Sequence, residues 1–116
     1  MMKSEIDKLY AAVIKSRPDD PKTGATARLL AADRSKVAKK VVEEAAEVSL
    51  AAMADDRKEV VRETADLFYN LVVLLATMGI KPKDVWREMA SRKAALGLAG
   101  KLPKAAKNGN GAGGGK

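Results

Sequence analysis

Two pairs of acidic residues lie at matching places in this sequence of 116 residues. Glu44 and Glu47 form one pair, Glu63 and Asp66 form the other, and both have the spacing i, i+3. Residues three apart share one face of an α-helix, so each pair offers two carboxylates on one side. Carboxylate oxygens are the ligands that hard cations such as Mg²⁺ and Mn²⁺ prefer. The pattern therefore predicts a metal site built from all four carboxylates.

The turn between the two pairs is centred on position 55. Asp55 and Asp56 interrupt the helical pattern there, and Asp56 stands three residues before Glu59, the spacing of a capping box. Two long helices joined by so short a turn lie antiparallel, with residues equally far from the turn at one level. The expected neighbours are Glu47 with Glu63 and Glu44 with Asp66. We expect the four carboxylates to converge between helices whose axes lie about 8–10 Å apart.

Converging carboxylates repel one another unless a cation lies among them. A bound Mg²⁺ polarises a phosphoryl oxygen and activates water, so hydrolysis of a phosphoanhydride is the expected reaction. Glu43 is a further candidate for orienting the water, together with Glu44 and Glu47. The remaining candidates are side chains that would hold the phosphates of a nucleotide. They are Arg28, Lys36, Lys39, Lys40 and Asn70.

A solvated helix surface offers a simpler explanation for the first acidic pair. Lys39 and Lys40 stand four residues before Glu43 and Glu44, the spacing of surface ion pairs. The second pair is harder to explain in this way, because it lies among apolar residues. Carboxylates beside an apolar stripe lose hydration, which is costly unless they are paired or liganded. The flanking residues therefore favour the metal site.

The elements that must position these residues all have a helical pattern, with apolar residues recurring at intervals of three and four. The predicted helices are residues 4–15, 25–32, 35–54, 56–78 and 82–95. Ser35 is the predicted N-cap of the first long helix, Gly79 follows the second, and Pro82 begins the last. The expected buried side of the second long helix is Val60, Leu67, Leu71, Leu74, Leu75 and Met78. We predict an all-α bundle built on a long antiparallel helix hairpin.

The composition excludes several kinds of chemistry. The sequence has no Cys and no His, which excludes disulfides, thiol nucleophiles, zinc sites and acid–base catalysis by histidine. Aromatic residues make up only 3%, which argues against surfaces that stack nucleic-acid bases. The net charge is +7, but residues 101–116 carry four lysines and no acid. The remaining residues are close to charge balance, so we expect no nucleic-acid partner.

The end of the chain differs in composition from the rest. Residues 104–116 are rich in Gly, Asn and Lys, and we expect them to form a disordered tail after a single domain of residues 1–103. No stretch approaches the ~18 apolar residues of a membrane span. The N-terminal residues lack the apolar core of a signal peptide. We therefore expect a cytoplasmic protein without a membrane partner.

The segment that carries the acidic pairs resembles a known family. Residues 39–92 read KKVVEEAAEVSLAAMADDRKEVVRETADLFYNLVVLLATMGIKPKDVWREMASR. This segment looks like the core of the phosphoribosyl-ATP pyrophosphohydrolases, which belong to the MazG-like all-α NTP pyrophosphatases. The upstream TARLLA and the downstream LGLAGKLPK resemble flanking segments of the same family, so the resemblance covers about residues 22–104.

The resemblance implies an all-α, dimeric, Mg²⁺-dependent hydrolase of histidine biosynthesis. Its implied reaction splits the α–β bond of phosphoribosyl-ATP and yields phosphoribosyl-AMP and pyrophosphate. The positions that match the metal-binding residues of the family are Glu44, Glu47, Glu63 and Asp66, with Glu43 and Lys40 on the adjacent acidic and basic positions.

Three positions depart from the pattern of the family. Asn70 stands where the family usually has His, Ala25 where it has an aromatic residue, and Asp33 where it has Gly. Asn keeps hydrogen-bonding groups but cannot titrate. Two alternatives therefore stay open. One is a MazG-like house-cleaning NTP pyrophosphatase with another nucleotide substrate, and the other is a non-catalytic helical protein that binds partners or nucleic acid through its basic tail.

Overall fold

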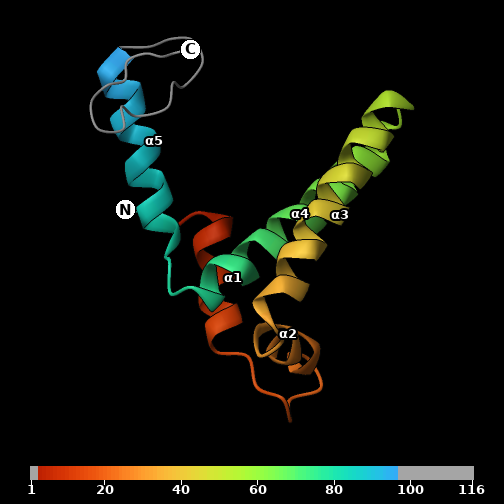
Figure 1. Cartoon of the computed structure of the whole chain (residues 1–116), viewed down its shortest axis with the longest axis vertical. Helices are drawn as coiled ribbons and strands as arrows, with labels where there is room; N and C mark the ends of the chain where they lie inside the picture. Colours follow the sequence, from red (N-terminus) through yellow and green to blue (C-terminus); the bar gives the residue numbers. More distant parts are fainter. Residues whose placement is uncertain (1–2, 97–116) are drawn as a thin grey trace. The chain divides into compact units, whose positions relative to one another are not determined.

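The computed structural model describes residues 3–96, and these form five α-helices and no strand (Figure 1). The helices are α1 (Glu5–Ile14), α2 (Gly24–Leu30), α3 (Arg34–Met53), α4 (Arg57–Thr77) and α5 (Pro82–Leu96). The predicted all-α class is confirmed. The predicted disordered tail lies outside the described residues.

The chain divides into two compact units, one that ends at Pro82 and one that begins at Lys83. Helices α1 to α4 belong to the first unit, which carries every candidate site residue. Helix α5 begins at Pro82, as the sequence predicts, because proline suits the first helical position. Ion pairs along its surface join Arg87 to Asp84 and Arg92 to Glu88.

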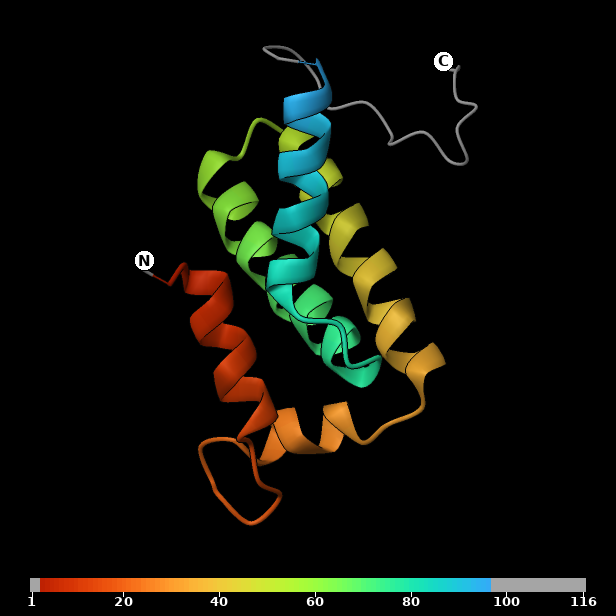
Figure 2. The same cartoon turned by 90° about the vertical axis from the view of Figure 1, so that its left-hand side faces the viewer.

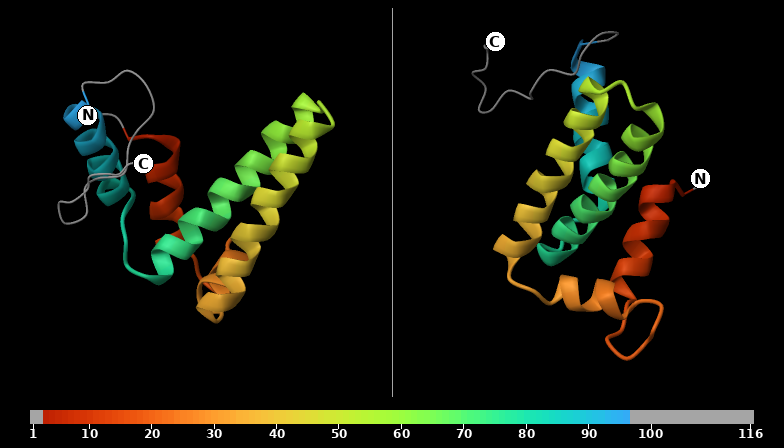
Figure 3. Two further views of the ribbon diagram at one scale, coloured as in Figure 1. Left: turned by 45° about the horizontal axis from the view of Figure 1, so that its top comes forward. Right: turned by 90° about the vertical axis from the view of Figure 1, so that its right-hand side faces the viewer.

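Helices α3 and α4 form the predicted antiparallel hairpin and lie side by side in both side views (Figure 2; Figure 3, right). Asp55 makes the turn between them with a φ of 57°, a conformation that Asp tolerates better than most residues. Asp56 caps α4, because its carboxylate accepts a 3.1 Å hydrogen bond from the backbone N–H of Glu59. The turn residues thus fix where the second long helix begins.

The start of α3 differs from the prediction. Asp33, and not Ser35, is the N-cap residue, so Ser35 lies inside the first helical turn. The backbone N–H of Lys36 already donates to the carbonyl of Asp33 over 2.9 Å. The side chain of Asp33 makes no capping hydrogen bond.

The end of α4 follows the expected glycine motif. Gly79 adopts a φ of 70°, which residues with a Cβ atom rarely adopt. The N–H of Gly79 donates to the carbonyl of Ala76, and the N–H of Ile80 donates to that of Leu75. These two bonds satisfy carbonyls that the helix end would otherwise leave unpaired.

The core is a cluster of buried valines from three helices: Val13, Val37, Val72 and Val73. Helices α1 and α2 both pack on α4, and Leu9 and Tyr10 of α1 lie against the cluster. The predicted buried side of α4 is only half-buried, and Met78 is 50% exposed. The prediction missed Val72 and Val73, because their burial depends on how α1, α2 and α3 together pack around α4.

No single helix among the described residues is long and apolar enough to cross a membrane.

Candidate functional site

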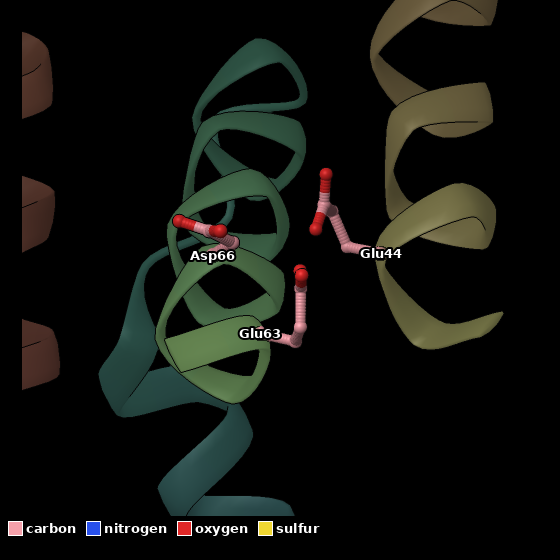
Figure 4. Close-up of side chains that lie close together, drawn as sticks. All are labelled: Glu44, Glu63 and Asp66. Atoms are coloured by element: carbon pink, nitrogen blue, oxygen red, sulfur yellow. The ribbon is translucent and has the colours of Figure 1, made fainter. Parts of the chain in front are cut away.

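Three carboxylates from the two long helices lie close together (Figure 4). Glu44 comes from α3, Glu63 and Asp66 come from α4, and one oxygen from each lies within 4.8 Å of the others. The spacing of Glu63 and Asp66 places both side chains on neighbouring positions of one helix surface. Glu44 and Glu63 are half-buried, and Asp66 is exposed. We call these three residues the carboxylate cluster.

The carboxylate cluster is electrostatically unbalanced. A hydrogen bond with Glu59, burial and the nearby Glu44 together raise the pKa of Glu63 from 4.5 to about 7. Oxygen Oε1 of Glu44 is buried and has no hydrogen-bond partner among the described residues. A buried acceptor without a partner is costly, and a cation among the carboxylates would relieve both features. The donor set of oxygens alone fits a hard divalent cation.

Two of the predicted acids lie outside this cluster. The side chains of Glu43 and Glu47 are exposed, and neither belongs to the group of converging oxygens. Three residues turn a helix through ~300°, so Glu47 lies about 60° around α3 from Glu44. Equal distance from the turn predicts the level of a residue along the hairpin, but not the side of the helix on which it lies.

Glu59 is a neighbour of the cluster that the sequence reasoning missed. It lies four residues before Glu63 on the same face of α4, is half-buried, and forms a 3.2 Å ion pair with Arg62. Glu59 and Glu63 are four residues apart, so they share one face of the helix. This spacing is the sequence signal that indicates Glu59 as a neighbour of the cluster.

A pocket of about 400 Å³ is lined by residues of α2, α3 and α4. Its lining residues are Ala25, Arg28 and Leu29 of α2, Lys36 and Lys40 of α3, and Tyr69 of α4. Lys40 lies one helical turn before Glu44, and Tyr69 lies one turn after Asp66. On each long helix, a residue that lines the pocket therefore lies one turn from a member of the carboxylate cluster. We call it the cationic pocket.

Three of the five predicted phosphate-binding residues meet in this pocket, namely Arg28, Lys36 and Lys40. The other two do not line it. Lys39 is exposed, one residue away from Lys40 and about 100° around the helix.

Asn70 is buried, with only 6% of its surface exposed. Its Nδ2 donates a 2.9 Å hydrogen bond to the backbone carbonyl of Asp66. Its Oδ1 is buried and has no partner among the described residues. Asn70 thus contacts the backbone of Asp66, a member of the carboxylate cluster. A residue that touches substrate in the pocket would line it, and Asn70 does not.

A hydrogen bond between side chains holds α2 against α4 at the pocket. The hydroxyl oxygens of Thr26 and Tyr69 lie 2.7 Å apart, and either can be the donor. Ala25, the departure from the family pattern noted above, is exposed at this edge.

Comparison with known proteins identifies similar sequences. The family described as phosphoribosyl-ATP pyrophosphohydrolase matches residues 7–93. "Phosphoribosyl-ATP pyrophosphatase 2" of Bradyrhizobium diazoefficiens is 52% identical over 105 residues, which are 90% of this chain and 78% of that protein. The protein of the same name in Rhodopseudomonas palustris is 50% identical over 103 residues, 89% and 79% of the two chains.

A relative with the name "Phosphoribosyl-ATP pyrophosphatase" in Gluconobacter oxydans is 40% identical over 99 residues, which cover 85% of this chain and 74% of that protein. The family resemblance predicted from the sequence is confirmed. On the match across most of its length, this chain belongs to the phosphoribosyl-ATP pyrophosphohydrolase family.

Proposed function

We propose that this protein hydrolyses phosphoribosyl-ATP to phosphoribosyl-AMP and pyrophosphate with the help of Mg²⁺, as a step of histidine biosynthesis. Family membership supports the reaction. The observation that carries the proposal is a cluster of three carboxylates beside a pocket with three cationic side chains. The first can hold a metal ion and the second a polyphosphate, which are the two requirements of phosphoanhydride hydrolysis.

Glu44, Glu63 and Asp66 would hold the Mg²⁺. We add Glu47 as a fourth ligand, because its exposed carboxylate lies one turn beyond Glu44 on the same helix. The bound ion supplies charge neutralisation at the phosphate oxygens and makes the phosphorus more electrophilic. Mn²⁺ would substitute for Mg²⁺, because it takes the same oxygen ligands.

The other candidate residues receive more limited roles. Arg28, Lys36 and Lys40 would bind the phosphates of the substrate. A carboxylate of the cluster, and not the exposed Glu43, would orient the attacking water. Asn70 would position Asp66 through its backbone. Lys39 is left out of the substrate contacts because it does not line the pocket.

We also propose that the protein forms a homodimer. The exposed apolar surface of the hairpin supports this proposal. Val61, Phe68 and Val72 recur along one side of α4. Val72 is buried, whereas Val61 and Phe68 are 68% and 45% exposed. The far end of the hairpin extends beyond α1 and α2 (Figure 3, left). A second copy would cover the part of this side that α1 leaves open.

Helix α3 carries a second stripe of exposed apolar side chains. Val42, Leu50 and Met53 are each more than 60% exposed and lie on the side of α3 away from Val37 and Glu44. Apolar side chains in such number on one small hairpin are typical of an interface between subunits.

The direct test is to incubate the protein with phosphoribosyl-ATP and Mg²⁺ and to measure both products. We expect pyrophosphate and phosphoribosyl-AMP in equal amounts, loss of turnover in a chelator and recovery with Mn²⁺. A panel of free nucleoside triphosphates serves as the comparison. Faster hydrolysis of a free triphosphate than of phosphoribosyl-ATP would contradict the proposed substrate. Because such polyphosphates do not cross membranes unaided, we propose the cytoplasm as the place of the reaction.

A further inference from the structure

The cationic pocket holds uncompensated positive charge. Arg28, Lys36 and Lys40 line one space of about 400 Å³, and no acidic residue of the described part of the chain lines it. None of the three forms an ion pair within residues 3–96, although several exposed cations elsewhere do. Like charges gathered in one concavity repel one another, and a bound anion would offset that cost.

The start of α3 adds to the positive field of the pocket. Its first turn contains Lys36 and no acidic residue. The side chain of the N-cap residue Asp33 makes no capping hydrogen bond. A helix N-terminus carries partial positive charge, so a lysine there is unfavourable unless an anion lies nearby.

The position of the pocket indicates which part of a substrate it receives. Lys40 is one turn from Glu44 on α3, and Tyr69 is one turn from Asp66 on α4. One helical turn spans about 5.4 Å, a distance that the two phosphates beyond the reacting phosphorus can bridge. In the proposed substrate, the strongly anionic group next to the reacting phosphorus is the pair of phosphates that departs.

We propose that the cationic pocket binds the pyrophosphate leaving group. This inference rests on the proposed function, since it assumes that the carboxylate cluster marks the reacting phosphorus. The oxygen of a water molecule bonds to the α-phosphorus, and the bond from that phosphorus to the bridging oxygen breaks. The bridging oxygen keeps the electron pair and leaves as part of pyrophosphate, and one proton of the water passes to a carboxylate or to solvent.

The charges of the pocket serve this step. Negative charge grows on the bridging oxygen and the departing phosphates as the bond breaks. Cationic donors placed where that charge develops stabilise the transition state more than the ground state. Arg28 offers a planar fork of donors, whereas Lys36 and Lys40 offer compact charges. The three side chains come from two helices, so they can grip the anion from different sides.

The substrate carries a second source of phosphate, the single phosphate of its phosphoribosyl arm. That group is separated from the reacting phosphorus by two sugars and a base, so it would lie far from the carboxylate cluster. The pocket also gathers three cationic side chains, which is more than a single phosphate needs. Both features favour pyrophosphate.

The test is titration calorimetry of the metal-free wild-type protein with inorganic pyrophosphate, and separately with ribose 5-phosphate. We expect pyrophosphate to bind at least about 10-fold more tightly than ribose 5-phosphate. Lys40→Met and Arg28→Met are each expected to weaken pyrophosphate binding about 10-fold, the effect of losing one hydrogen bond to a charged group. Lys39→Met is the matched control, because it removes the same charge one residue away and outside the pocket.

Equal effects of Lys39→Met and Lys40→Met would overturn the inference, because they would indicate general attraction instead of a pocket. Tighter binding of ribose 5-phosphate would overturn it as well and assign the pocket to the phosphoribosyl arm. Unchanged melting temperatures show that the variants fold. Turnover of phosphoribosyl-ATP is measured separately. Turnover without pyrophosphate binding in the pocket refutes only this inference, whereas pocket binding without turnover refutes the proposed function.

Discussion

The hydroxyl groups of Thr26 and Tyr69 lie 2.7 Å apart and connect α2 to α4 across 43 positions of the chain. Tyr69 lines the cationic pocket, and Thr26 lies between Ala25 and the pocket residue Arg28 in sequence. The hydrogen bond therefore fixes the wall that α2 contributes to the pocket. Local sequence signals do not contain it, because it depends on how α2 packs.

Removal of either hydroxyl is expected to loosen that wall. Tyr69→Phe and Thr26→Val should each lower the free energy of unfolding by about 1 kcal/mol, the net value of one part-buried hydrogen bond. The double variant should cost less than the sum of the two, because both remove the same interaction. Denaturant unfolding of the four proteins gives the coupling. Simple additivity would show that the pair does not interact in solution.

The carboxylate cluster is expected to be indispensable for turnover. Glu44→Gln, Glu63→Gln and Asp66→Asn should each lower kcat/KM by about 10² or more, because each loses a charge that holds the metal near the developing charge. Steady-state assays over a range of Mg²⁺ concentrations measure the loss. Glu5→Gln, a change to an exposed acid at the start of α1, should leave kcat/KM unaltered.

Glu47 provides the sharpest version of this test. We expect Glu47→Gln to abolish turnover while leaving the melting temperature unchanged, since we propose that its carboxylate joins the metal ligands. Its side chain lies outside the cluster of converging oxygens. Wild-type turnover in this variant would limit the metal ligands to the three carboxylates that already meet.

The raised pKa of Glu63 predicts a pH-dependent stability in the metal-free protein. The folded state keeps a proton on Glu63 up to about pH 7, whereas the unfolded chain releases it near 4.5. Its stabilising contribution is therefore complete below that lower value and disappears as the pH rises through about 7. Melting temperatures in a chelator, from about pH 5 to about pH 8, should fall more steeply for the wild type than for Glu63→Gln.

Added Mg²⁺ should reduce this fall, because the cation binds the deprotonated carboxylate. Glu5→Gln serves as the control and should keep the wild-type dependence. Parallel curves for the wild type and Glu63→Gln would refute a shifted carboxyl at this position.

The apolar side of α4 predicts a dimer that a single charge disrupts. Phe68→Lys should shift the protein from dimer to monomer and raise the dissociation constant at least about 100-fold, because a lysine head group must lose its hydration in the interface. Sedimentation equilibrium measures the change. Ile14→Lys, at a 51% exposed apolar position on α1, is the matched control and should remain dimeric. A monomeric wild type would refute the proposal.

Local signals in the sequence were sufficient to predict the hairpin. Asp56 caps α4, Gly79 terminates it, and Pro82 begins α5, and each effect depends on a few neighbouring residues. The common level of Glu44 and Asp66 along the hairpin follows in turn, because the two residues are equally far from a short turn.

The remaining features depend on packing and were not accessible in the same way. Val72 and Val73 are buried in a cluster that joins α3 and α4 to α1, which lies far away in sequence. The separation of Lys39 from Lys40 depends on which side of α3 the pocket occupies. Asn70, predicted to contact substrate, is buried against the backbone of its own helix, a difference that periodicity alone does not reveal.

The converging carboxylates and half of the pocket lining lie on different helices, and this has a consequence for sequence change. All three converging carboxylates reside on α3 and α4, whereas α2 supplies half of the pocket lining and none of the acids. Helix α2 has only seven residues. Substitutions within that short segment can therefore alter how the departing phosphates are held without changing the three converging carboxylates. The proposed metal ligands and half of the proposed phosphate pocket therefore lie on separate pieces of chain, so each can change in sequence without the other.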